Sequence, residues 1–176
     1  MTVAEFLDWN ERQEGKFELL RGEVYVMAPG TIQLARSKLA AVNALAAVIK
    51  RAGLPCEAFI DGPGIALGDH TCYIPDVSVH CGERASGEVR LVPNPVIVIE
   101  VLSPSTERLD KTGKLADYFS IAGLQHYVIV NLERRFVMHH RRADAGLITT
   151  AILREGELRL DPPGVTLAVA EMFGEG

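Results

Sequence analysis

The run from Pro95 to Leu102 constrains the fold more than any other segment of the chain. It reads Pro-Val-Ile-Val-Ile-Glu-Val-Leu and is rich in β-branched residues. Side chains alternate along a strand, so the even-numbered residues, Glu100 among them, share one face and the odd-numbered residues the other. Both faces are otherwise apolar, which predicts a central strand that is covered on both sides.

A second carboxylate precedes another apolar stretch, in the sequence Tyr-Ile-Pro-Asp-Val-Ser-Val that ends at Val79. Pro75 cannot donate to a strand ladder and belongs at a strand start, which places Asp76 near the end of its strand. An ionised carboxylate in a buried strand is costly unless a cation, a metal or several donors compensate it. If the two strands are neighbours, Asp76 and Glu100 together suggest a metal site.

Each acid also has a purely structural interpretation. Asp76 follows a proline and could only cap a turn. Glu100 could be a strand-end residue held by backbone donors or by an arginine such as Arg108. Both alternatives stay open at the level of sequence, although the pair together favours a functional site.

A helix is predicted from about residue 108 to residue 122. Helical spacing places Lys111 early on its apolar stripe and Lys114 on the flank of that stripe, adjacent to Tyr118. This arrangement aims a lysine toward the sheet. The alternative is a solvated ion pair between Asp110 and Lys114, which stand four residues apart.

The remaining segments predict an α/β fold with strands in the middle and helices on both sides. Thr2 and Glu5 form a capping-box pattern, and a hairpin turns at Arg21-Gly22. Further expected elements are a long helix over 31–52, strands over 125–130, 135–142 and 147–153, and a closing helix over 167–173. With 176 residues, 48% of them apolar, the chain is expected to form a single domain over 1–176.

The three cysteines, Cys56, Cys72 and Cys81, form no Cys-x-x-Cys pair. They are expected to be core fillers in a reducing compartment, without a disulfide framework. His70 and Cys72 with His80 and Cys81 supply zinc-type donors, but adjacent strand residues point to opposite faces, which disfavours a shared metal.

Charge and hydropathy limit the partners. A net charge of −5 does not favour binding of a polyanion. The clusters at 134–135 and 139–142 could nevertheless form a local basic surface. The other interpretation of these clusters is an exposed strand with solvated charges. The N-terminus lacks a signal-peptide pattern and no apolar run is long enough to span a bilayer, so a cytoplasmic protein without a membrane span is predicted. Arg36 and Lys38 also oppose a membrane interpretation of the helix over 31–52.

Three segments together resemble the Uma2 family of putative endonucleases, which belongs to the PD-(D/E)XK, restriction-endonuclease-like superfamily. They are Pro-Asp-Val-Ser-Val at 75–79, Val-Ile-Glu-Val-Leu-Ser-Pro-Ser-Thr at 98–106 and Asp-Lys-Thr-Gly-Lys-Leu-Ala-Asp-Tyr at 110–118. The likeness extends over nearly the whole chain. It implies a restriction-endonuclease-like α/β fold, with a central mixed β-sheet flanked by helices.

The resemblance also implies roles for individual residues. Asp76 and Glu100 would bind Mg²⁺ or Mn²⁺, and Glu18 matches the upstream acid that often joins them. The superfamily lysine normally stands two residues after the glutamate, but that position is Leu102 here. A lysine on the following helix is the expected substitute, and Lys114 matches it.

The function implied is metal-dependent hydrolysis of DNA by a homodimer. The opposing class is a catalytically inactive nuclease-fold protein that serves in binding or assembly. Leu102 and the acidic net charge support that class, whereas the retained acids and Lys114 oppose it. Without a metal, Asp76 and Glu100 are expected to repel each other, so at least one should have a raised pKa.

Overall fold

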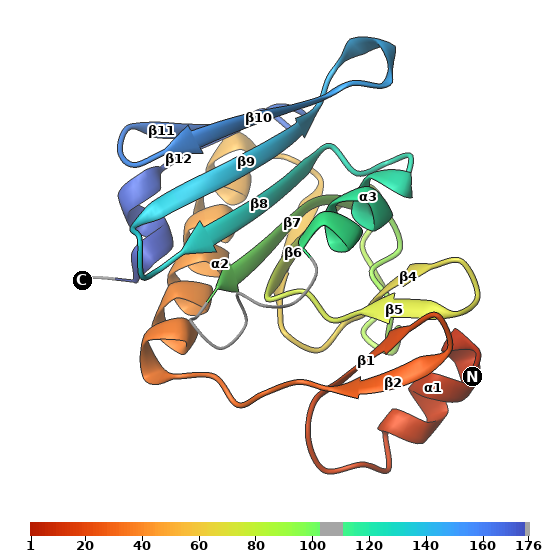
Figure 1. Ribbon diagram of the computed structural model, residues 1–176. Helices are drawn as coiled ribbons and strands as arrows, with labels where there is room; N and C mark the ends of the chain where they lie inside the picture. Colours follow the sequence, from red (N-terminus) through yellow and green to blue (C-terminus); the bar gives the residue numbers. More distant parts are fainter. Residues whose placement is uncertain (103–110, 175–176) are drawn as a thin grey trace.

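The computed structural model describes residues 1–102 and 111–174, with only the backbone at 111 and 112. Its centre is a six-stranded mixed sheet in the order β10-β9-β8-β7-β6-β3 (Figure 1). The strands are β3 (Cys56–Ile60), β6 (Val77–Cys81), β7 (Pro95–Leu102), β8 (His126–Asn131), β9 (Phe136–Arg142) and β10 (Ile148–Leu153). Strands β7 and β8 are parallel and the other neighbours are antiparallel. The central mixed β-sheet expected from the sequence is confirmed.

A smaller sheet forms the N-terminal side of the molecule. It has the order β2-β1-β5-β4 and packs with α1 (Val3–Asn10), whose Thr2–Glu5 capping box is formed as predicted. Its strands are β1 (Phe17–Leu20), β2 (Glu23–Val26), β4 (Ile65–Leu67) and β5 (Thr71–Tyr73). Because β1 pairs with β5 and β5 leads into β6, this sheet brings Glu18 to the start of β6.

Helix α2 (Ile32–Ala52) covers one face of the large sheet. Its range matches the helix predicted over 31–52. Thr31 caps its first turn by accepting from the Leu34 N–H, and Gly53 ends it in the left-handed conformation. The helix has the length and apolar character of a membrane span, contrary to the expectation that no run is long enough. In this fold its buried face packs on the sheet.

Helix α3 (Lys111–Ser120) covers the other face and connects the parallel strands β7 and β8. The alternation predicted along β7 is confirmed. Ile97, Ile99 and Val101 belong to the core beneath α2, whereas Val98 packs in the core beneath α3.

The predicted helix over 167–173 is wrong in its first part. Val165–Ala168 is a strand, β12, which pairs with β11 (Glu157–Leu160), and only Val169–Phe173 forms a 3₁₀ helix, η2. Val165 and Leu167 are buried while their neighbours are exposed, which is the two-residue period of a strand. The turn at 161–164 joins the two strands.

The cysteine prediction is also wrong. Cys56 and Cys81 stand directly opposite each other on β3 and β6 and form a disulfide, whereas Cys72 is free and buried as expected of a core filler. Sequence spacing did not reveal this pair because it depends on which strands become neighbours. The zinc alternative loses Cys81 to the disulfide, and the described part of the chain contains no group of three His, Cys, Asp or Glu placed to hold a metal. The cysteine argument for a reducing compartment therefore loses its basis, and the cytoplasmic location stays a prediction.

The C-terminal end of η2 contacts α2 closely, and two glycines allow a matched test. Gly53 and Gly174 have similar positive φ angles, 63° and 65°, but a Cβ on Gly174 would lie 2.6 Å from the Arg36 backbone, whereas one on Gly53 would meet nothing within 4 Å. We expect Gly53→Ala to cost about 1 kcal/mol of unfolding free energy. Gly174→Ala should cost about 1–3 kcal/mol more because of the added overlap. Urea denaturation measures both, and equal losses would contradict the close packing of η2 on α2.

Candidate active site

Asp76 lies immediately before β6, opposite Glu100 of β7 by the register that pairs Val77 with Ile99. It is buried, and its Oδ2 accepts a hydrogen bond from the Val101 N–H at 2.6 Å. The carboxylate thus joins the two strands at a position where Pro75 leaves the backbone without a donor. Asp76 therefore does more than cap a turn.

Glu100 lies on the side of the sheet that α3 covers. Its Oε1 accepts from the Tyr118 hydroxyl at 3.0 Å and pairs with the Lys114 ammonium at 3.2 Å. The predicted approach of Lys114 to the sheet is present in the structure. Arg108, the other candidate partner, lies outside the described residues.

Lys114 bridges two of the predicted acids. Its Nζ lies 2.9 Å from Glu18 Oε1 as well as 3.2 Å from Glu100, and 4.7 Å from the centre of the Tyr73 ring. Glu18 also accepts from the Ile74 N–H, so it is fixed between β1 and the approach to β6. Lys114 is engaged with buried acids and is not simply a solvated residue. Asp110 and the side chain of Lys111 lie outside the described part.

Lys38 is a site residue that was not predicted from the sequence, where it served only as evidence against a membrane-spanning helix. Its buried ammonium lies 2.5 Å from Asp76 Oδ1 and 3.2 Å from Asp61 Oδ1. A signal was present, because Lys38 stands four residues after Leu34 and four before Val42, on the buried stripe of α2. A lysine on such a stripe requires a buried partner.

Burial dominates the electrostatics of the two central acids. It raises the pKa of Asp76 to about 6, with a further increase from the charge of Glu100 and an opposing effect of Lys38. Burial also raises the pKa of Glu100, which Lys114 opposes and Glu18 reinforces. The raised pKa expected from the sequence is present, but its first cause is desolvation and repulsion comes second.

The donor set fits a hard divalent cation. Mg²⁺ binds oxygen ligands, commonly one or two carboxylates completed by water, and Asp76 and Glu100 stand opposite each other at one end of neighbouring strands. Glu18 does not complete a three-carboxylate cluster in the described residues, since no such group is formed there and its Oε1 faces Lys114. Its part as a third ligand stays a prediction.

A family model described as "Putative restriction endonuclease" matches residues 3–170. The chain belongs to this family, Uma2. Two uncharacterized proteins of Synechocystis sp. are similar to it. One is 29% identical over 98% of this chain and 91% of its own length, and the other 26% identical over 88% and 89%.

The Uma2 fold is shared with a solved structure. The crystal structure of a putative nuclease of the DUF820 family from Anabaena variabilis superposes with a TM-score of 0.74 at 19% identity, covering 98% of this chain and 97% of that one. At this identity the likeness shows the fold alone. The assignment to a restriction-endonuclease family therefore rests on the family match.

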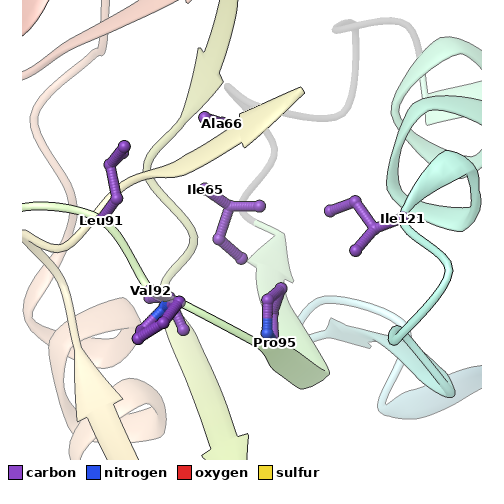
Figure 2. A pocket seen from close by; sticks show the side chains of 7 residues that line it. Ile65, Ala66, Leu91, Val92, Pro95 and Ile121 are labelled. Atoms are coloured by element: carbon purple, nitrogen blue, oxygen red, sulfur yellow. The ribbon is translucent and has the colours of Figure 1, made fainter. Parts of the chain in front are cut away.

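An apolar cavity of about 260 Å³ lies away from the acids. Figure 2 shows Ile65, Leu91, Val92, Pro95 and Ile121 around it. Pro95 begins β7, whereas Glu100 stands near its other end. The lining contains no ionisable side chain, so this cavity lacks the groups that hydrolysis requires.

Replacing Asp76 with Asn tests the buried charge. The folded-state pKa, about 6, lies above the ordinary value of 3.8, so the native state binds this proton more tightly than the unfolded state does. The stability from this group is therefore fully present below a pH of about 4 and lost as the pH rises through about 6. We expect the unfolding free energy of wild type, relative to Asp76→Asn, to fall by up to about 3 kcal/mol between a pH of about 4 and 7.

Urea titrations in chelator across this range measure the difference. Burial lowers the pKa of His126 and of His139 to about 4. Both histidines titrate in the two proteins alike, so their contribution cancels in the difference. A difference that stays constant or rises with pH would contradict a buried, destabilised Asp76 carboxylate.

Proposed function

We propose that this Uma2 protein is a metal-dependent endonuclease that hydrolyses phosphodiester bonds of DNA. The observation that carries the proposal is the opposed pair of buried carboxylates, Asp76 and Glu100, with the Lys114 ammonium on Glu100. A purely structural role would not need two buried acids with raised pKa values at the same end of neighbouring strands. The family and the fold support the same class of reaction.

Asp76 and Glu100 would hold Mg²⁺ or Mn²⁺ through their carboxylate oxygens. When bound, such an ion supplies Lewis-acid polarisation of the scissile phosphate and lowers the pKa of water. Lys114 donates to Glu18 and Glu100, and the third N–H of its ammonium would donate to a phosphate oxygen or to the attacking water.

Other side chains would hold these groups in place. Tyr118 donates to the same Glu100 oxygen that Lys114 contacts, which fixes the orientation of that carboxylate. Glu18 anchors Lys114 from the opposite side at 2.9 Å. We infer that Tyr118 and Glu18 are positioning residues, because both contact a proposed catalytic group.

Binding of DNA is expected to be weak without the metal. The net charge is −5. Of the two clusters expected to form a basic surface, 134–135 is exposed, whereas 139–142 is largely taken up by internal contacts. His139 and His140 are buried, and Arg142 donates to the carbonyl oxygens of Phe119, Ile121 and Leu124. Arg141 alone of this cluster is exposed. Few cations therefore remain there to replace the counterions of DNA.

Glu100→Gln tests the metal site because it removes one charge and nearly preserves the shape. In chelator, we expect the variant to be no less stable than wild type, since the buried repulsion is gone. Mn²⁺ should raise the melting temperature of wild type, by the equivalent of about 2.7 kcal/mol at a hundredfold excess over the dissociation constant. The variant should lose this rise together with cleavage of supercoiled plasmid.

The same plasmid assay assigns the lysine. Lys114→Ala should slow cleavage by about a hundredfold or more, whereas Lys111→Ala should leave it nearly unchanged. Unimpaired turnover in Lys114→Ala would remove that lysine from the site. If wild type shows neither a melting shift nor cleavage, or if Glu100→Gln keeps the full shift, the non-enzymatic binding or assembly protein replaces the endonuclease.

We also propose that the protein acts as a homodimer, because many nucleases cut the two strands of DNA with two active sites and a two-fold interface is the usual arrangement. The support comes from the family and from the expected reaction. Light scattering at micromolar concentration should give about twice the chain mass of 19.2 kDa. A species of one chain mass alone would reject the dimer.

A further inference from the structure

The Asp76 carboxylate already carries a cation supplied by the chain itself. Lys38 reaches it from α2, on the face of the sheet opposite α3, and its Nζ lies 2.5 Å from Asp76 Oδ1. Only 11% of the Lys38 side chain and 8% of the Asp76 side chain are exposed, so water screens this pair little. The second oxygen of Asp76 is held by the Val101 N–H.

A second acceptor for Lys38 stands beside the first. Asp61 Oδ1 lies 3.2 Å from the same ammonium, and the Asp61 N–H donates to the Asp76 carbonyl oxygen at 3.1 Å. This backbone bond keeps the two aspartates adjacent, so Lys38 needs only a small displacement to pair with Asp61 alone. Asp61 is more exposed than Asp76, with 31% of its side chain accessible, and it also pairs with Lys16 at 3.0 Å.

We propose that Lys38 is an internal counter-ion that competes with the divalent cation for Asp76, and that Asp61 receives the lysine when the cation binds. The inference rests on the proposed function, in which Asp76 and Glu100 hold the metal. An ammonium and a divalent cation on the same carboxylate repel each other strongly in a buried site. Transfer of Lys38 to Asp61 relieves that repulsion without leaving the lysine unpaired.

This exchange explains why a buried site can exist without metal. Removing one partner of a buried ion pair leaves an uncompensated charge, so a buried Asp76 that also feels the charge of Glu100 would be strongly destabilising without a cation. Lys38 supplies that cation in the metal-free protein. Metal affinity is then lower than the two carboxylates alone would give, and it depends on Asp61.

Isothermal titration calorimetry with MnCl₂ tests the exchange without relying on activity. Lys38→Gln should lower the dissociation constant for Mn²⁺ by about tenfold or more, because the competitor is gone. Lys16→Gln is the matched control. It removes the same charge from Asp61 but does not touch Asp76, so its dissociation constant should stay within about twofold of wild type.

A double-mutant cycle separates the exchange from a simple effect of charge. Asp61→Asn alone should raise the dissociation constant several-fold, because Lys38 then remains on Asp76. In the Lys38→Gln background the same Asp61→Asn change should have almost no effect. An electrostatic field effect of Asp61 on the metal would instead persist in both backgrounds, and that result would overturn the proposal.

The outcomes also distinguish this proposal from the proposed function. Binding in Lys38→Gln but not in wild type supports the exchange. Equal affinity in wild type and Lys38→Gln overturns the counter-ion role and leaves the metal site intact, whereas no binding in any protein overturns both. If Lys38→Gln is unfolded by circular dichroism in chelator, Lys38→Met, which keeps the apolar stem of the lysine, takes its place with the same expected tightening.

Discussion

The antiparallel pairing of β6 with β7 is the constraint on which the site depends. Its register sets Asp76 opposite Glu100, and the Asp76 carboxylate extends the pairing by accepting the Val101 N–H. A shift of one residue would turn every side chain of one strand to the other face. The central core would be lost together with the opposition of the two acids, so folding and site formation depend on the same contacts.

The two helices that cover the sheet also neutralise its acids. Lys38 comes from α2 on one face and Lys114 from α3 on the other, and each pairs with one of the opposed carboxylates. Burying these carboxylates is unfavourable by itself, as their raised pKa values indicate. Correct docking of both helices therefore stabilises the site, and a cation between the acids would take over part of that role.

Membership of the Uma2 family and the overall negative charge point in different directions for DNA binding, and the geometry suggests how they are compatible. The four carboxylates pair with three lysines: Lys38 bridges Asp61 and Asp76, Lys114 bridges Glu18 and Glu100, and Lys16 pairs with Asp61. Much of the negative charge here is thus committed to internal pairs. Entry of a divalent cation would make the net charge of the site positive. This charge would favour binding of a phosphate at the site but not across the whole surface.

Local patterns in the sequence determined the alternation along β7, the hairpin at Arg21-Gly22 and the limits of α2, because these depend on periodicity and on capping within a few residues. Asp76 and Glu100 were found from their strand positions, Lys114 from helical spacing and the family motifs, and Glu18 from the family motifs alone. Only the tertiary structure decided that Cys56 bonds to Cys81 and that Lys38 reaches Asp76. Both contacts join segments 25 or more residues apart. Their formation depends on strand order and helix docking, which no local pattern encodes.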